Sequence, residues 1–224
     1  LITNGDFSSD TNWNYTTSWE ISNGKANFTN IASKGFYQPK VLDANKTYRV
    51  SFDYSGTGQV GFLGTAGGSN TLKGFANYTE GNNIIYITPT TTTSAFNIWG
   101  NWTGAFSIDN VSCVEVAQDW ALGTGWSIGE NKAVYDGLSG TQPITAIGGA
   151  APQVGKTYKV SFDVLEQGSG INSAFLGGVN FSATNLAVGS YVFYVKTTNR
   201  NKFQIFGRNG SVFSITNISV KEVG

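Results

Sequence analysis

One stretch of the sequence sets the architecture of the chain: KTYRVSFD at residues 46–53, which recurs as KTYKVSFD at residues 156–163. In both copies apolar and polar residues alternate, so that Tyr48, Val50 and Phe52 fall on one side of an extended segment. Alternation with a period of two is the pattern of a half-buried β-strand. The stretch therefore predicts a strand at each place and, because it is repeated, an internal duplication.

Matching segments extend the duplication to nearly the whole chain. The spacing between the two copies of each segment drifts and then recovers, which indicates loops of different length within one repeated fold. We expect two domains, residues 1–116 and 117–224, without a Gly/Ser-rich or Pro-rich linker between them. The matched segments are Trp13 and Trp19 with Trp120 and Trp126, FLG at 62–64 with FLG at 175–177, FNIWG at 96–100 with FQIFG at 203–207, and FSIDNVS at 106–112 with FSITNIS at 213–219.

Each copy has the sequence features of an all-β domain. Residues 84–87 and 191–195 are near-continuous apolar runs of strand-forming residues, which favours strands in the middle of a sheet. Glycine-containing turn clusters, such as residues 55–58 and 67–70, separate the expected strands, and no stretch keeps the period of 3.6 residues typical of a helix. Many short strands in a domain of roughly 100 residues predict a β-sandwich. We therefore expect two tandem β-sandwich domains of the jelly-roll type.

The composition excludes several kinds of chemistry. The chain has no histidine and a single cysteine, Cys113, so it has neither a histidine-based catalytic triad nor a histidine or cysteine zinc site. Lysine and arginine balance aspartate and glutamate at 14 each, which gives no basic surface for nucleic acid. No long apolar run is present, so we expect no membrane insertion. Because methionine is also absent, we expect the chain to be a processed product or a fragment of a larger protein.

Several short motifs carry a resemblance to a known family. They are NGDF at residues 4–7, NGKA at residues 23–26 and the closing IDNVS at residues 108–112, arranged in order around the KTYRVSFD strand. With these motifs the chain resembles carbohydrate-binding modules of the family 4/9/22-like, galactose-binding-domain-like group, and it is similar to modules of phage tail-fibre and other virion proteins. The resemblance implies a jelly-roll fold and glycans as ligands, although this fold also serves as a spacer or assembly domain.

Aromatic residues without an obvious place in a core give the candidate ligand platform. Trp102 lies in a glycine-flanked turn where the second copy has no tryptophan. Indole and phenol rings offer an apolar face and a polar group, which suits the stacking of sugars. We therefore predict a platform of Trp102 with Trp99 or Tyr37, assisted by Asn97 and Asn101. The alternative, which has equal weight, is that these residues pack a loop or contact a neighbouring chain.

Other prominent residues have structural interpretations. Trp19 and Trp126, each followed by an apolar residue two positions on, are expected in the cores of the two domains. Asp53 and Asp163 occupy matching positions, and we expect each to pair locally with basic residues of its strand. A glycosidase needs two carboxyl groups about 5–9 Å apart, and nothing in the sequence brings two acids of one copy together. We therefore expect no enzyme activity within the chain and assign no catalytic residue.

A calcium site is implied by the resemblance. In the resembling modules a structural calcium commonly lies between the first and last strands, bound by carboxylate and carbonyl oxygens, the hard ligands that this ion prefers. Asp6 and Asp109 occupy the corresponding motifs of the first copy, whereas the second copy has Thr216 in place of Asp109. We expect calcium in the first domain only. The alternative is that Asp6 caps a turn and Asp109 faces solvent.

These observations predict a non-catalytic module of an extracellular or virion appendage, of the phage tail-fibre type, that binds surface glycans. Two alternatives remain open. One is a structural or assembly module of a virion or fibre that binds no sugar, and the other is an accessory binding module of a secreted glycoside hydrolase. The expected partners are glycans and, for the assembly role, virion or fibre proteins. We expect weak binding at each site, strengthened by multiple copies.

Overall fold

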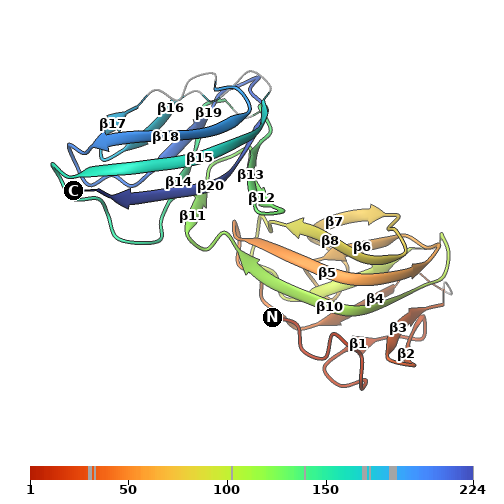
Figure 1. The fold of residues 1–224 in the computed structure, drawn as a ribbon. Helices are drawn as coiled ribbons and strands as arrows, with labels where there is room; N and C mark the ends of the chain where they lie inside the picture. Colours follow the sequence, from red (N-terminus) through yellow and green to blue (C-terminus); the bar gives the residue numbers. More distant parts are fainter. Residues whose placement is uncertain are drawn as a thin grey trace. The chain divides into compact units, whose positions relative to one another are not determined.

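The computed structural model describes residues 1–29, 32, 34–101, 103–138, 140–167, 171, 173–181 and 186–223. The regular structure of this part consists of β-strands, which confirms the prediction of an all-β chain (Figure 1). The chain divides into two compact units, unit 1 (Leu1–Val116) and unit 2 (Ala117–Gly224). Within the described residues, no helix has the length and apolar character needed to cross a lipid bilayer.

Unit 1 is a sandwich of two five-stranded antiparallel sheets. We name them after their central strands, the β4–β9 sheet and the β5–β10 sheet. The last strand of the unit, β10, lies in the middle of its sheet between β3 and β5. The strand order of the β4–β9 sheet is β1 (Asn14–Tyr15), β4 (Lys34–Gln38), β9 (Phe96–Gly100), β6 (Val60–Leu63), β7 (Thr71–Ala76). The strand order of the β5–β10 sheet is β2 (Trp19–Ser22), β3 (Lys25–Phe28), β10 (Phe106–Val116), β5 (Thr47–Gly56), β8 (Gly81–Ile87).

Unit 2 repeats this topology strand for strand, so the duplication in the sequence is also a duplication of strand order. Its sheets are the β14–β19 sheet and the β15–β20 sheet. The strand order of the β14–β19 sheet is β11 (Trp120–Leu122), β14 (Gln142–Ala146), β19 (Gln204–Gly207), β16 (Ser173–Leu176), β17 (Val179–Asn180). The strand order of the β15–β20 sheet is β12 (Trp126–Gly129), β13 (Lys132–Tyr135), β20 (Phe213–Glu222), β15 (Thr157–Gln167), β18 (Gly189–Lys196).

In each unit, the inward side chains of both sheets meet in an aromatic-rich core. Trp19 is 3% exposed, and its indole N–H donates to the carbonyl of Lys34 at 2.9 Å. Trp126 is 7% exposed and donates in the same way to the carbonyl of Gln142 at 2.8 Å. The prediction that both tryptophans lie in cores is confirmed. Each indole also ties its two sheets together, because the donor belongs to one sheet and the acceptor to the other.

The two apolar runs that were expected in the middle of sheets form edge strands instead. Among the described residues, β8 pairs only with β5, and β18 pairs only with β15. Because side chains alternate along a strand, half of each run faces solvent. Ile84 is 44% exposed, Val192 51% and Tyr194 67%. The continuity of these runs therefore reflects one buried face and one exposed apolar face, rather than burial on both sides.

Candidate functional site

The outward face of the β4–β9 sheet in unit 1 carries aromatic side chains. β4 and β9 pair so that Tyr37 and Trp99 point away from the core, whereas Phe36 and Ile98 between them point inward and are fully buried. Both outward rings are partly exposed. Phe75 of the edge strand β7 is 42% exposed. We call Tyr37, Trp99 and Phe75 the aromatic face of unit 1.

Trp99 is positioned by glycines on neighbouring segments. Gly68, in the loop before β7, has a φ of +81°, and a Cβ built on it would lie 2.4 Å from the indole ring. Gly61 is the partner of Trp99 on β6, and a Cβ there would lie 3.1 Å from the ring of Phe75. The backbone of the loop therefore approaches the indole closely, and Phe75 covers the position beside it. Larger residues at these positions would displace the aromatic rings.

Asn97 lies on the same face as Trp99 but is fully buried. Its Oδ1 accepts the N–H of Phe36 at 3.1 Å, and its Nδ2 donates to the carbonyl of Thr65 at 2.8 Å. Gly35 makes room for it, since a Cβ on that residue would lie 2.5 Å from Oδ1 of Asn97. Asn97 thus holds the loop after β6 over the sheet. Because its side chain is fully buried, it is not accessible to a ligand.

The remaining residues of the predicted platform follow β9 in the sequence. Asn101 is partly buried, and its side-chain amide donates to Oε1 of Gln59 at 3.3 Å. Trp102 lies outside the described residues. The structure therefore brings Tyr37, Asn97 and Trp99 together on one face and leaves Asn101 at its margin.

Unit 2 carries an aromatic pair on the equivalent sheet that the sequence did not indicate. The repeated FLG aligns Phe175 with Phe62, a core residue, but the strand pairing puts Ala174 in the place of Phe62. A shift of one residue sends a side chain to the opposite face of a sheet. Phe175 therefore points outward and meets Phe206 of β19 edge to face, with ring centroids 5.5 Å apart. Matching residue types could not reveal this, because only the pairing of β16 with β19 fixes the register.

A polar side chain lies beside this second aromatic pair. Gln204 is the partner of Phe175 on β19, and its Nε2 donates to Oγ1 of Thr145 on β14 at 3.0 Å. Both polar residues line a hollow of about 530 Å³, together with Arg200 and Lys202. Unit 2 thus offers two rings next to the amide of Gln204, which borders a hollow that also holds a hydroxyl and two basic groups.

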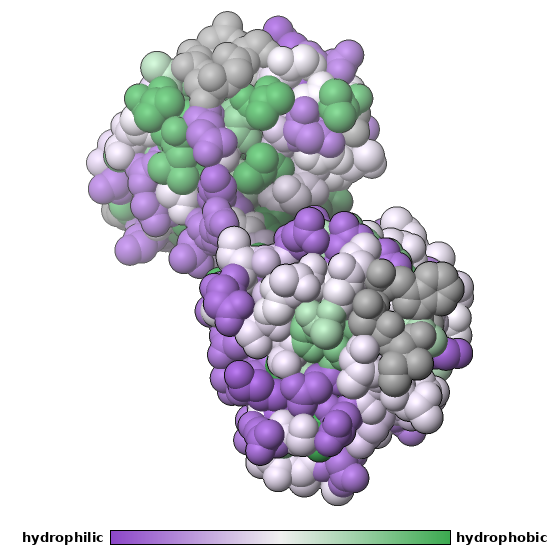
Figure 2. Space-filling view, turned by 90° about the vertical axis from the view of Figure 1, so that its right-hand side faces the viewer, coloured by the Kyte–Doolittle hydropathy of each residue, from purple (hydrophilic) through white to green (hydrophobic). Residues whose placement is uncertain are grey.

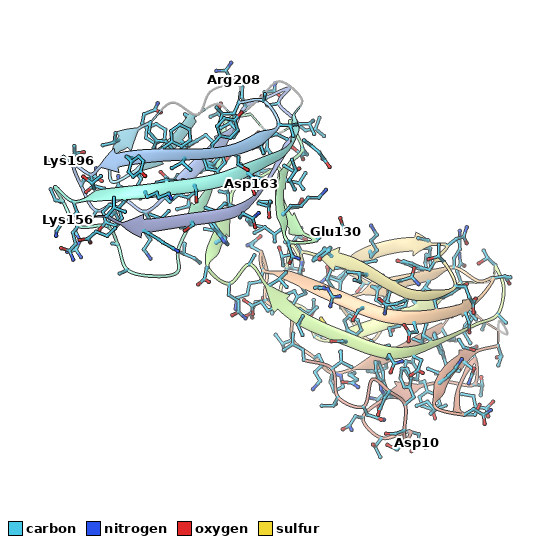
Figure 3. All side chains as sticks on the ribbon, viewed as in Figure 1. Asp10, Glu130, Lys156, Asp163, Lys196 and Arg208 are labelled. Carbon is cyan, nitrogen blue, oxygen red and sulfur yellow. The ribbon has the colours of Figure 1, made fainter. Side chains whose placement is uncertain are left out.

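The two matched aspartates have amide and hydroxyl partners on neighbouring strands, which corrects the expectation of pairing with basic residues of their own strand. The carboxylate of Asp53 accepts hydrogen bonds from Asn110 on β10 at 2.8 Å and from Asn82 on β8 at 3.0 Å. These bonds, that from Asn110 foremost, lower the pKa of Asp53. In unit 2, Asp163 (labelled in Figure 3) accepts from Ser190 and, at 2.6 Å, from Asn217, and both bonds lower its pKa.

The acidic residues predicted to bind calcium lie on different elements. Asp6, in the loop before β1, accepts hydrogen bonds from the N–H and hydroxyl of Ser8 at 3.4 and 3.2 Å. Asp109, on β10, accepts the N–H of Asn110 at 2.6 Å. In the part of the chain that the structure describes, no three acidic or cysteine side chains come together as a metal site. Calcium binding stays a prediction, and carbonyl oxygens would have to supply most of the ligands.

The chain matches known proteins in structure rather than in sequence. No protein family matches it, and no curated protein does. Solved structures do match. One is the N-terminal CBM22-1–CBM22-2 tandem domain of Xyn10C from Paenibacillus barcinonensis, at 11% sequence identity and a TM-score of 0.33, over 96% of this chain and 94% of that chain. The description of each unit as a two-sheet sandwich rests on its own strand pairings.

The aromatic face of unit 1 and the Phe175–Phe206 pair, which we call the aromatic face of unit 2, can stack on a ligand and form hydrogen bonds with it. The rings of Trp99, Phe75, Phe175 and Phe206 offer apolar surface, and in unit 2 Gln204 adds an amide beside them. Aromatic rings can stack on apolar surfaces, and an amide can both donate and accept hydrogen bonds.

Proposed function

We propose that the chain is a non-catalytic tandem carbohydrate-binding module that attaches to surface glycans. The observation that carries the proposal is the presence of outward aromatic side chains on the same sheet of both units: Tyr37, Trp99 and Phe75 in unit 1, and Phe175 with Phe206 in unit 2. Contiguous apolar patches on the surface of a soluble protein mark binding sites for ligands or partners.

Sugars fit such faces for physical reasons. A pyranose ring has an apolar side formed by its C–H groups, which stacks on an aromatic ring, and hydroxyl groups around its edge that bond to amides. Gln204 and Thr145 supply an amide and a hydroxyl beside Phe175. Each face is shallow, so each site binds weakly, and two sites on one chain raise the overall affinity for a repeating polysaccharide.

We also propose that the chain lies outside the cell or on a virion, as part of an appendage of the tail-fibre type. The resemblance of its motifs to modules of phage tail fibres supports this setting. So does a composition with only 12% charged residues, since such a surface relies on amides and hydroxyls for its contacts.

A glycan array probed with the full chain tests the proposal. We expect binding to a restricted set of neutral glycans, weakened at least about tenfold by Trp99→Ala or Phe206→Ala. Trp102→Ala tests the remaining member of the predicted platform. Tyr194→Ala is the matched control, since Tyr194 is an exposed aromatic residue on the other sheet of unit 2, and we expect it to bind like the parent chain. Absence of glycan binding, or equal loss in the control, would contradict the proposal.

A second function, assembly with another protein, is favoured by the exposed apolar side chains of unit 2. Val192 and Tyr194 on the edge strand β18 are 51% and 67% exposed. Figure 2 shows hydrophobic surface in patches on unit 2, the upper unit in that view. In this role the chain would bind no sugar, and the Tyr194→Ala variant, rather than Trp99→Ala, would weaken association with the partner.

A further inference from the structure

The first residues of the chain close one end of the sandwich in unit 1. Phe7 is 1% exposed, and its ring centroid lies 5.4 Å from that of Trp13 and 5.6 Å from that of Phe36. Trp13 in turn stacks on Phe36 at 4.4 Å. The segment Leu1–Phe7 thus contributes an aromatic anchor to the core without being a strand of either sheet.

The backbone of this segment is held by the last strand of the unit. The N–H of Val111 on β10 donates to the carbonyl of Gly5 at 2.8 Å. A Cβ built on Gly5 would lie 1.9 Å from the carbonyl oxygen of Val111, so only glycine permits this approach. In the NGDF motif, the glycine therefore bonds to β10, and the phenylalanine two positions later fills the space between the sheets.

Unit 2 has no counterpart of this segment. Phe7 precedes Trp13 by six positions, and the residue six positions before Trp120 is Val114, which belongs to β10 of unit 1. Where Phe7 would enter, unit 2 has a cavity of about 450 Å³. Its lining includes Trp120, Ile128, Lys132, Ile144, Ile215 and Ile218.

The cavity walls are the equivalents of the residues that Phe7 and Gly5 contact in unit 1. Trp120 and Ile144 stand in the places of Trp13 and Phe36 at the matching positions of β11 and β14. Trp120 is partly exposed, whereas Trp13 is 6% exposed. Ile218 follows Asn217 on β20 as Val111 follows Asn110 on β10, so its N–H occupies the position that binds Gly5 in unit 1. The second unit thus keeps the receiving site of the segment.

A basic group at the rim complements the charge of such a segment. Lys132 begins β13, beside the turn that contains Glu130 (labelled in Figure 3), and lines the cavity. Its ammonium pairs with Glu166 at 3.1 Å and remains partly exposed. In unit 1 the carbonyl of Asp6 lies 4.0 Å from a Cβ built on Gly24, next to Lys25, the equivalent of Lys132. The backbone of the residue just before the aromatic anchor would therefore lie beside the turn that leads into Lys132, where an acidic side chain is within reach of its ammonium.

We propose that the cavity of unit 2 binds an extended peptide segment of another polypeptide, with a glycine, an acidic residue and a phenylalanine in succession. The phenyl ring packs against Trp120 and Ile144, the glycine carbonyl accepts the N–H of Ile218, and the carboxylate faces Lys132. The site is separate from the aromatic faces, so a partner protein can dock here while glycans bind elsewhere.

The segment does not come from a second copy of this chain. Residues 1–7 of every copy already close its own unit 1, where Phe7 is 1% exposed. Moving the segment to unit 2 of a neighbour would open one cavity as it filled another, so the exchange gains no burial. A segment of a different protein, which has no such site of its own, gains the full burial of its phenylalanine.

The test uses the peptide LITNGDFSS, the sequence of residues 1–9, labelled with a fluorophore and titrated with the full chain. We expect saturable binding by fluorescence anisotropy. A peptide with Phe7→Ala should bind about 10- to 100-fold more weakly, because it loses the burial of one phenyl ring. Equal binding of the two peptides, or absence of binding at millimolar concentration, would overturn the proposal.

Variants of the full chain locate the site. Lys132→Glu should weaken binding of the peptide and restore it for a peptide with Asp6→Lys, whereas Lys25→Glu in unit 1 should change nothing. Ala133→Leu, which narrows the cavity, should abolish binding, with Val134→Leu on the same strand as its control. An equal effect of Lys25→Glu would contradict the location. Concentration-dependent dimers that Phe7→Ala abolishes would show that the occupant is a second copy instead.

Discussion

Asp53 accepts a hydrogen bond from the side-chain amide of Asn110 at 2.8 Å, and the same bond joins Asp163 to Asn217 at 2.6 Å in unit 2. Both asparagines have a positive φ, 50° and 53°. In unit 1 the bond spans a break in the pairing of β10 with β5, where the register shifts between Asp109 and Ser112. Asparagine tolerates this left-handed conformation better than most residues, and the carboxylate holds its side chain across the irregularity.

Removing this amide should destabilise unit 1. We expect Asn110→Gly, which keeps the positive φ but loses the hydrogen bond, to lower the free energy of unfolding by about 0.5–1 kcal/mol, a value reduced for solvent exposure. Urea denaturation followed by tryptophan fluorescence measures the change. Asn23→Gly is the control, since Asn23 has a φ of 54° in the turn between β2 and β3. A loss of equal size in the control would assign the effect to the backbone rather than to the hydrogen bond.

Acid should weaken both units through the same carboxylates. Hydrogen bonds lower the pKa of Asp53 and Asp163 from the ordinary 3.8. Each group therefore binds its proton more tightly in the unfolded chain, and its contribution to stability is complete above the unfolded pKa and is lost as pH falls through the lowered folded pKa. We expect the decline to begin near pH 4. Urea denaturation at pH 7, 4 and 3 should show a smaller decline in a chain carrying Asp53→Asn and Asp163→Asn, and an unchanged decline would contradict the assignment.

Gly35, which adjoins the side chain of Asn97, should tolerate no side chain of its own. A Cβ on Gly35 would lie 2.5 Å from Oδ1 of Asn97, so Gly35→Ala would push the amide off the carbonyl of Thr65 and release the loop. We expect a loss of about 1–3 kcal/mol in the free energy of unfolding, the usual range for overpacking. Gly74→Ala on the same sheet has no atom within 4 Å of the new Cβ and should stay within about 0.5 kcal/mol of the parent. Similar losses in the two variants would refute this role of Gly35.

The single cysteine should be inert in the folded chain. Cys113 is 1% exposed, and burial raises the pKa of its thiol to about 11. Since the thiolate is the reactive form, we expect modification by a disulfide reagent at pH 8 to be at least about 100-fold slower in the native chain than in urea. Comparable rates in the two conditions would mean that β10 opens readily.

Calcium binding to unit 1 is tested by thermal unfolding with calcium chloride against a chelator. We expect a higher Tm with calcium for the parent chain, because an ion bound only to the folded state stabilises it by mass action. Asp109→Asn should remove the difference, whereas Asp163→Asn in unit 2 should keep it. No difference for the parent chain would eliminate the site.

The sequence predicts the duplicated sandwich well because its signals are local. Alternation in KTYRVSFD identifies β5 and β15, and the tryptophan pairs mark both cores, since each depends on residues close together in the chain. The edge positions of β8 and β18 did not follow from their apolar runs, because exposure depends on which strands flank them in the sheet.

The candidate site was harder to predict because it depends on pairing between distant strands. Asn97 resembles a surface amide in the sequence, and only the loop folded over it shows that it is buried. Phe175 resembles a core residue by alignment, yet a shift of one residue in β16 turns it outward. Trp99 and Tyr37 were predicted as aromatic residues without an obvious place in a core, and the regular pairing of β4 with β9 turns both outward.

The central place of β10 and β20 bears on how the protein is made. β10 is the last strand of unit 1 to leave the ribosome, and yet it separates β3 from β5. Until residue 116 has emerged, both neighbours present unpaired edges to the other nascent chains of a polysome. Unit 1 therefore completes its β5–β10 sheet in one late step, after its last strand has emerged. A translation product that stops short of Phe106 keeps two open edges and is a substrate for chaperones or aggregation.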